Sequence, residues 1–96
     1  MKLTKKELQT IRKILKQHEV KRAELFGSYA RGEAHKRSDV DLLIEFHHKN
    51  KKSLLDLSGL LLDLQDNLHK KVDVVTSGSI HPRLKPYIEK DLMTII

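Results

Sequence analysis

The chain has 96 residues, of which 39% are hydrophobic and 33% charged, and its net charge is +6. This length predicts a single domain over residues 1–96, and the absence of cysteine excludes a disulfide scaffold or a cysteine zinc site. No apolar stretch approaches the ~18 residues of a membrane span, and the first residues lack the apolar core of a signal peptide. We therefore expect a cytoplasmic protein without a membrane partner.

The first predicted elements are a helix, a strand and a short helical turn. Thr4 and Glu7 have the spacing of a capping box, and apolar residues follow at intervals of three and four. This pattern predicts a helix that ends near Gln17. Val20–Phe26 is expected to form a strand, and Ser28 is expected to cap the short helical turn that follows it.

The middle of the chain predicts a second strand and a long helix. Val40–Phe46 has the apolar character of a buried strand, and it follows a polar loop. Ser53 is expected to cap the long helix, and Gly59 inside this helix indicates close packing against a neighbour. The helix is predicted to pack through a broad apolar face, which comprises Leu54, Leu57, Leu61, Leu64 and Leu68, flanked by Leu55, Leu60 and Leu62.

The end of the chain predicts a third strand, a last helix and an apolar tail. Lys71–Thr76 is expected to be the strand, and Pro82 is placed where the last helix can begin. Met93–Ile96 is expected to form a short strand. This order of elements predicts an α/β (α+β) domain with a small mixed β-sheet of three to four strands, flanked by helices.

The candidate chemical residues lie at the ends and in the middle of these strands. Gly27 and Ser28 follow a strand and begin a helical turn, a position where backbone N–H groups and a hydroxyl suit phosphate oxygens. Asp39 and Asp41 are two positions apart on an extended segment, so their side chains project from the same face. Asp73 interrupts another apolar strand, and it joins the same cluster if the two strands are adjacent.

Clustered carboxylates repel one another unless a cation compensates their charge. Hard oxygen ligands select Mg²⁺ or Mn²⁺, and Mg²⁺ commonly completes its coordination with substrate phosphates. Two such ions can stabilise both the attacking and the leaving oxygen in phosphoryl or nucleotidyl transfer. The pattern of residues therefore indicates a divalent-metal site suited to phosphoryl or nucleotidyl transfer.

Gly27-Ser28, followed by Asp39-Val40-Asp41 and a later strand with Asp73, resembles the DNA polymerase β-like nucleotidyltransferase superfamily. The stretches Gly27–Gly32 and Ser38–Leu42 look like those of its minimal nucleotidyltransferase (MNT) branch. The resemblance extends from Val20 through the strand of Asp73 to the segment 81–84. It implies the polymerase β-like nucleotidyltransferase fold, with ATP as substrate and Mg²⁺ as cofactor, where two ions are expected and Mn²⁺ is an alternative.

The resemblance also implies a role for each candidate residue. Gly27 and Ser28 would hold the triphosphate, and Arg31 would assist them or brace the loop. Asp39, Asp41 and Asp73 would be the catalytic metal ligands, and Asp73 would also receive the proton of the attacking group.

The partner implied by the same resemblance is a HEPN-domain toxin, because MNT proteins act as antitoxins of such proteins. In this branch the antitoxin transfers AMP from ATP to a tyrosine of the toxin. The chain would then be a protein adenylyltransferase of a type VII-like toxin–antitoxin pair.

Other interpretations remain open at the level of sequence. The chain could neutralise its toxin by binding alone, or it could modify a small molecule, although its length leaves little room for an acceptor domain. Asp41 or Asp73 could form a structural ion pair with a lysine or Arg31. Direct nucleic-acid binding is supported only by the net charge of +6, since aromatic residues make up just 4% of the chain.

Overall fold

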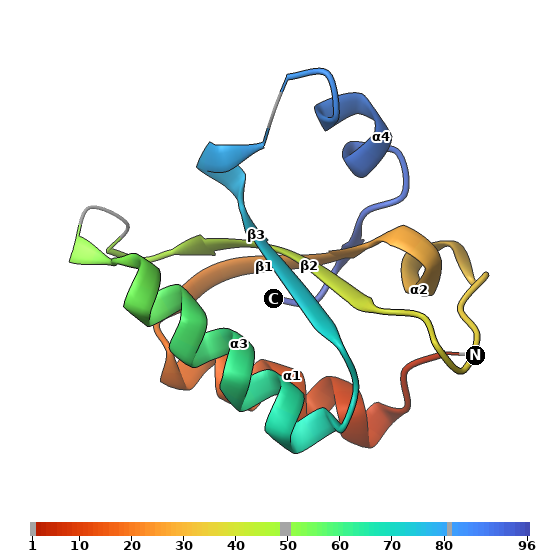
Figure 1. Ribbon diagram of the computed structural model, residues 1–96, viewed down its shortest axis with the longest axis horizontal. Helices are drawn as coiled ribbons and strands as arrows, with labels where there is room; N and C mark the ends of the chain where they lie inside the picture. Colours follow the sequence, from red (N-terminus) through yellow and green to blue (C-terminus); the bar gives the residue numbers. More distant parts are fainter. Residues whose placement is uncertain (1, 49–50, 81) are drawn as a thin grey trace.

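The computed structural model describes residues 2–48, 51–80 and 82–96, in which helices and strands alternate along the chain. The strands form one sheet in the order β3-β2-β1-β4, in which β2 and β3 are parallel and the other neighbours antiparallel. This confirms the predicted mixed sheet flanked by helices. In chain order the elements are α1 (Lys5–Gln17), β1 (Val20–Phe26), α2 (Gly27–Arg31), β2 (Val40–Phe46), α3 (Leu54–Leu68), β3 (Val72–Thr76), the 3-10 turn η2 (Ser77–Ser79), α4 (Lys85–Glu89) and β4 (Met93–Thr94) (Figure 1).

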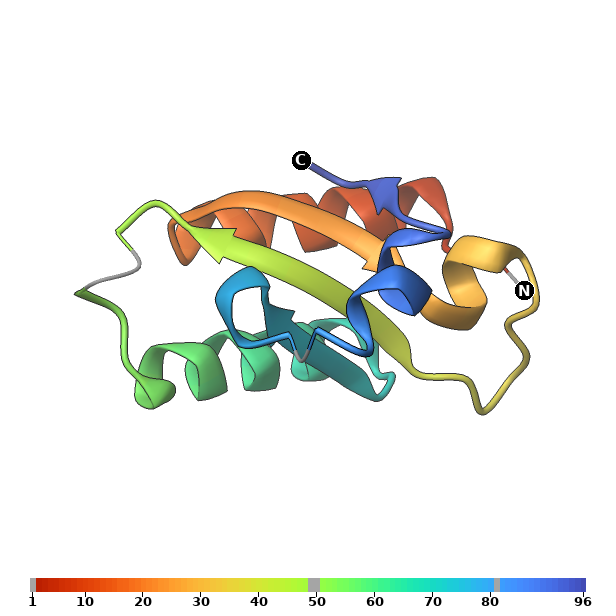
Figure 2. The same ribbon diagram turned by 90° about the horizontal axis from the view of Figure 1, so that it is seen from above.

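The two long helices α1 and α3 cover one face of the sheet, whereas η2 and α4 lie on the side of the other face (Figures 1 and 2). Side chains alternate between the two faces of a strand, so one set of positions in β2 enters the core below the sheet. The core packs side chains of α1 and α3 against those of β1 and β2. Its largest fully buried members are Ile11, Leu15, Leu25, Val40, Leu42, Ile44, Leu60 and Leu64.

Helix α1 begins with the predicted capping box. The backbone N–H of Glu7 donates to the Thr4 hydroxyl at 3.0 Å, and the N–H of Thr4 donates to the Glu7 carboxylate at 2.9 Å. Two N–H groups that the helix leaves without an internal partner are thus satisfied. The helix ends at Gln17, as the periodicity predicts.

Helix α3 begins after Ser53 as predicted, but its apolar stripe is shifted. Leu60 lies at the buried centre of the helix, whereas Leu54 in the first turn is 81% exposed above a cleft of about 310 Å³. The prediction for Gly59 is wrong as well, because a Cβ at this position would meet nothing within 4 Å. Leu54 has the apolar spacing of the helix, but the first turn of α3 is not covered by the rest of the core. The spacing of leucines alone therefore does not predict which of them are buried.

The C-terminal segment differs from the prediction in its helix boundary. Turn residues follow Pro82, and α4 begins only at Lys85, with Pro86 in its first turn. Proline is tolerated there because its missing N–H would have no helical partner. The predicted last strand exists as β4, which pairs with β1, and His81 lies outside the described residues. None of the helices in the described ranges is long and apolar enough to cross a membrane.

Candidate active site

A row of three side chains crosses the sheet on the face opposite α1 and α3. Asp41 of β2 pairs with Phe26, the last residue of β1, and with Asp73 of β3. Partners in a strand ladder point to the same face of the sheet. The structure therefore brings Asp41 and Asp73 side by side, at the point where β1 turns into α2.

Two features of the structure require a glycine at position 27. Its backbone has φ +74°, in the left-handed region that glycine adopts without steric cost. A Cβ at this position would overlap the carboxylate of Asp41 and lie 3.2 Å from its Cγ. Gly27 thus lets the turn pass directly over Asp41, which explains why a glycine stands here.

The short helix α2 begins at Gly27 itself, which corrects the prediction that Ser28 caps it. Phe26 is the N-cap residue and makes no capping hydrogen bond with its side chain, so Ser28 lies inside the first turn. The adjacent Tyr29 is 4% exposed and anchors the helix in the core. Gly32, with φ +74°, ends the helix in a left-handed conformation.

Asp41 has a raised pKa of about 6 in this environment. Its partial burial is the largest cause, because removal of water disfavours the charged form. The negative charges of Asp73 and then Asp39 raise the pKa further, while the positive charge of Arg31 opposes them. The three aspartates predicted from sequence therefore act on one another electrostatically.

The structural alternative for these aspartates was an ion pair with a nearby cation. Among the described residues, no lysine, arginine or histidine forms an ion pair with Asp39, Asp41 or Asp73. Arg31 therefore offsets only part of the mutual repulsion of these carboxylates. Such a site is electrostatically suited to a divalent cation.

The oxygen ligands fit a cation of the Mg²⁺ type, which prefers carboxylates and keeps part of its water shell. The protein alone does not complete the coordination of such an ion. Within the described part of the chain, no three Asp, Glu or His side chains are gathered as a metal site. Asp41 and Asp73 are direct neighbours in the sheet, whereas Asp39 precedes β2 and is exposed. The remaining coordination would fall to water and substrate oxygens.

Arg31 is the candidate residue with a protein partner. Its Nε donates to the Glu33 carboxylate at 3.1 Å, and its side chain is 40% exposed. The guanidinium still acts on Asp41, whose charged form it favours. Arg31 therefore lies close enough to the carboxylates to influence them, while Glu33 holds its side chain at the surface.

Sequence reasoning missed the contacts that hold α2 in place. Lys70, in the turn before β3, has its Nζ 2.6 Å from the Glu7 carboxylate and 5.9 Å from the centre of the Tyr29 ring. These contacts connect α1, α2 and the start of β3. The sequence gives little indication of these contacts, because a single lysine after a helix carries no pattern that predicts its partners.

The same open face has a cleft further along β2. Its volume is about 250 Å³, and it lies between the sheet and the C-terminal segment. Leu43, two positions after Asp41 on the same face, contributes to its floor, and Lys85 and Glu89 of α4 contribute to its wall. The three aspartates do not line this cleft, which begins two positions along β2 from Asp41.

A glycine turn over a half-buried carboxylate, with a second carboxylate beside it on the open face of a small mixed sheet, is suited to nucleotidyl transfer. The fold and this face together place the protein in the nucleotidyltransferase class. Residues 8–94 match the family model described as "Nucleotidyltransferase domain". The chain belongs to this family, which confirms the resemblance inferred from the motifs.

Relatives and solved structures agree with this assignment. The chain is 49% identical over 83 residues to the Methanocaldococcus jannaschii protein named "Putative protein adenylyltransferase MJ0435", covering 86% of this chain and 87% of the relative. It resembles a solved structure described as a "putative minimal nucleotidyltransferase", with 33% identity, a TM-score of 0.78 and coverage of 92% and 88%.

Two toxin–antitoxin complexes contain chains with the same fold. One is a complex with AMP-PNP, whose chain matches with 23% identity and a TM-score of 0.80, covering 93% of this chain and 72% of that one. The other joins a tri-AMPylated Shewanella oneidensis HEPN toxin to an MNT antitoxin. There the match has 20% identity and a TM-score of 0.72, with coverage of 94% and 69%. At these identities the likeness concerns the fold.

Proposed function

We propose that this chain is a protein adenylyltransferase that transfers AMP from ATP to a tyrosine of a HEPN-domain toxin and thereby acts as its antitoxin. The pairing of Asp41 with Asp73 beside the Gly27 turn is the observation that carries this proposal. The name of the M. jannaschii relative and the toxin–antitoxin complexes that share the fold support the acceptor and the partner.

Gly27, Ser28 and Arg31 would bind the triphosphate of ATP. Gly27 has no side chain to obstruct an approaching phosphate, and Ser28 lies in the first turn of α2, where backbone N–H groups lack helical partners. Arg31 is on the same short helix and influences the charge of Asp41. Its guanidinium could exchange Glu33 for a phosphate, since both present oxygen acceptors to the same group.

Asp39, Asp41 and Asp73 would hold Mg²⁺, with two ions expected and Mn²⁺ as an alternative. The chemistry supplied by such ions is neutralisation of charge on the reacting phosphates and on the leaving group. Asp41 is central because it lies between Phe26 and Asp73 in the sheet and is the partly buried member of the three. The raised pKa of its carboxyl shows how unfavourable an uncompensated charge is at this position.

The reaction exchanges one phosphorus–oxygen bond for another. The tyrosine oxygen of the acceptor attacks the α-phosphorus of ATP, a bond forms between them, and the bond from that phosphorus to the bridging oxygen breaks. Diphosphate leaves with the bonding electrons. Asp73 is exposed at the edge strand β3, and its carboxylate would accept the hydroxyl proton of an incoming tyrosine.

The test uses ATP labelled at the α-phosphate, Mg²⁺ and a HEPN-domain protein from the same genome. The parent chain is compared with Asp41→Asn, with the double variant Asp39→Asn/Asp41→Asn, and with Asp66→Asn as a matched control. Asp66 is an exposed residue of α3. We expect label on a tyrosine of the HEPN protein with the parent and the control, and at least a 100-fold lower rate with the site variants.

Three results would contradict the proposal. Transfer by Asp41→Asn at the parent rate would remove the aspartates from the reaction. Absence of label with the parent, combined with inhibition of the toxin by both parent and Asp39→Asn/Asp41→Asn, would show that the chain neutralises its partner by binding alone. Label on a small molecule in place of the protein would identify a different acceptor class.

A further inference from the structure

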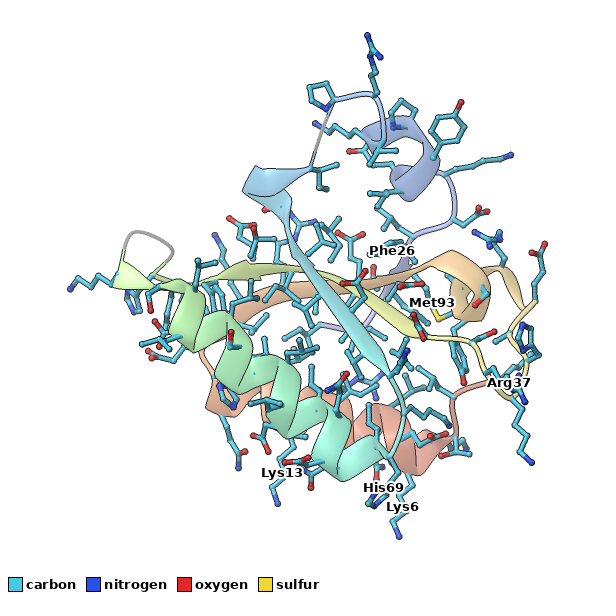
Figure 3. The ribbon with its side chains drawn as sticks, viewed as in Figure 1. Lys6, Lys13, Phe26, Arg37, His69 and Met93 are labelled. Carbon is cyan, nitrogen blue, oxygen red and sulfur yellow. The ribbon has the colours of Figure 1, made fainter. Side chains whose placement is uncertain are left out.

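A second surface feature, next to the carboxylates but outside the predicted site, is a basic cleft of about 360 Å³. Five of its six lining residues are basic, and none is acidic. The cleft lies between the loop before β2 and the turn between α3 and β3; in Figure 3, Arg37 marks the first segment and His69 the second. The lining residues are Lys36, Arg37, Ser38, His69, Lys70 and Lys71.

The cleft adjoins the candidate active site through the chain itself. Ser38 lines the cleft, and Asp39 follows it directly. Lys71 lines the cleft, and its carbonyl accepts a hydrogen bond from Val40, which continues the β2–β3 ladder toward the cleft. Asp73 lies two positions beyond Lys71, so both side chains leave an extended segment on the same face. A ligand in the cleft would therefore contact residues one position from Asp39 and two positions from Asp73 along the chain.

Three of the basic residues are available to a ligand. Lys70 is engaged by Glu7, and their hydrogen bond raises the pKa of Lys70, so it serves as a charged contact within the fold. Lys36, Arg37 and Lys71 are exposed, and none of them forms an ion pair within the described ranges of the chain. Positive charges gathered around one hollow repel one another, and an anionic ligand would relieve that repulsion.

The residues that line the cleft favour a short acidic peptide over a nucleic acid as its ligand. A single-stranded nucleic acid is usually held by aromatic side chains along a basic groove, and no aromatic residue of the Phe, Tyr or Trp type lines this cleft. The basic residues lie in one hollow and not along a stripe. Carboxylates on a flexible segment can reach three such cations without stacking.

We propose that the basic cleft of Lys36, Arg37 and Lys71 docks an acidic segment of the acceptor protein, next to the residue that receives AMP. This inference rests on the proposed function, because it names the substrate feature that the same site recognises. Acidic residues in the cleft would steer the acceptor hydroxyl toward Asp73, which follows Lys71 by two positions. The nucleotide and the acceptor would then approach the aspartates from different segments of the fold.

The test measures binding separately from transfer. Fluorescent peptides containing one tyrosine flanked by glutamates, by glutamines or by lysines are titrated with the full chain at several salt concentrations. The site variant is Lys36→Glu/Arg37→Glu/Lys71→Glu. The control Lys13→Glu/Lys16→Glu/Lys21→Glu changes the net charge by the same amount, using exposed residues of α1 and β1. Figure 3 shows Lys13 on α1, away from Arg37.

We expect the glutamate peptide to bind at least tenfold more tightly than the glutamine peptide, with an affinity that falls as salt is added. The site variant should lose this preference, while the control keeps it and both retain the melting temperature of the parent. Equal binding of the three peptides, or equal loss in both variants, would overturn the proposal. Tighter binding of an RNA oligonucleotide or of inorganic tripolyphosphate through the same lysines would assign the cleft to that ligand instead.

The failure of the docking site and the failure of the proposed function give different results. A chain that transfers AMP to the HEPN protein but shows no preference for acidic peptides retains the function and loses the docking site. A chain that binds the acidic peptide in the cleft but transfers nothing loses the adenylyltransferase assignment. Where both hold, AMP transfer to the glutamate peptide should exceed transfer to the glutamine peptide, and the site variant should remove the difference.

Discussion

Asp41 on β2 and Asp73 on β3 are register partners on adjacent parallel strands, so two carboxylates stand side by side on the open face of the sheet. Like charges at neighbouring positions destabilise a sheet when nothing compensates them. The fold places the partly buried Asp41 between Asp73 and the Gly27 turn, and its pKa rises to about 6 as a result of burial and of the neighbouring charges. The neighbouring carboxylates therefore lower the stability of the folded chain, and a bound cation would offset this effect.

The first prediction concerns how the destabilisation by the Asp41 carboxylate depends on pH. The pKa of Asp41 is about 6 in the folded chain and 3.8 for the unperturbed side chain, so the folded state binds the proton more tightly. Stability should therefore fall as the pH rises from about 4 to about 7. Asp41→Asn removes the titration, and without metal it should be more stable than the parent by about 1–2 kcal/mol at pH 7.5, after allowance for solvent screening.

Thermal unfolding in EDTA between pH 3.5 and pH 8 checks this prediction. The two proteins should unfold at similar temperatures at pH 3.5 and diverge above pH 5. Added Mg²⁺ should raise the melting temperature of the parent more than that of Asp41→Asn. Parallel curves across the whole pH range would mean that Asp41 carries no such cost.

The second prediction separates the two roles of Gly27. Gly27 and Gly32 both have φ +74°, but an added Cβ overlaps the Asp41 carboxylate only at Gly27, and it meets nothing within 4 Å at Gly32. Gly32→Ala should therefore cost about 1–2 kcal/mol of stability from backbone strain alone. Gly27→Ala should cost more than that and should weaken ATP binding, while Gly32→Ala leaves it nearly unchanged.

Urea unfolding and ATP titration of the two variants measure these effects. The double variant Gly27→Ala/Asp41→Ala provides room for the new methyl group, so its stability should exceed that of Gly27→Ala. Equal costs for the two glycine substitutions would show that the contact with Asp41 is unimportant.

The third prediction follows from the exposed Gly59 in the middle of α3. Nothing lies within 4 Å of a Cβ at this position, and its φ is not in the left-handed region. Gly59→Ala should stabilise the chain by about 0.5–1 kcal/mol, because alanine loses less backbone freedom on helix formation. Urea unfolding gives the difference directly, and a loss of stability would indicate a partner surface or a contact at this face.

The elements of the fold could be predicted where the sequence carries strong local patterns. The capping box of Thr4 and Glu7 and the apolar run of Val40–Phe46 both determined their elements correctly. The burial of Leu60 and the exposure of Leu54 could not be predicted in this way. Both lie in a helix rich in leucine, and only its orientation on the sheet decides which of them is covered.

The candidate site could be predicted in its residue types but not in its contacts. The spacing of Gly27, Ser28, Asp39 and Asp41 is local and carries the family resemblance. The register that places Asp73 beside Asp41 depends on a parallel pairing across α3, which no local pattern specifies. The Lys70 contacts with Glu7 and Tyr29 and the basic cleft likewise arise from segments distant in the sequence.

The last prediction concerns the division of work between Asp41 and Asp73. Asp41 lies beneath the Gly27 turn, next to the proposed triphosphate site. Asp73 is exposed on the edge strand β3, two positions after Lys71 of the basic cleft. Asp41→Asn should therefore weaken Mg²⁺-dependent ATP binding and abolish transfer. Asp73→Asn should leave ATP binding within about threefold of the parent and lower the transfer rate by about 100-fold or more, because it removes a proton acceptor and one ligand of the attacking side. Equilibrium binding of a non-hydrolysable ATP analogue, combined with single-turnover transfer to the HEPN protein, separates the two effects. If both variants lose ATP binding equally, the two carboxylates form one indivisible nucleotide–metal site, and Asp73 has no separate role toward the acceptor.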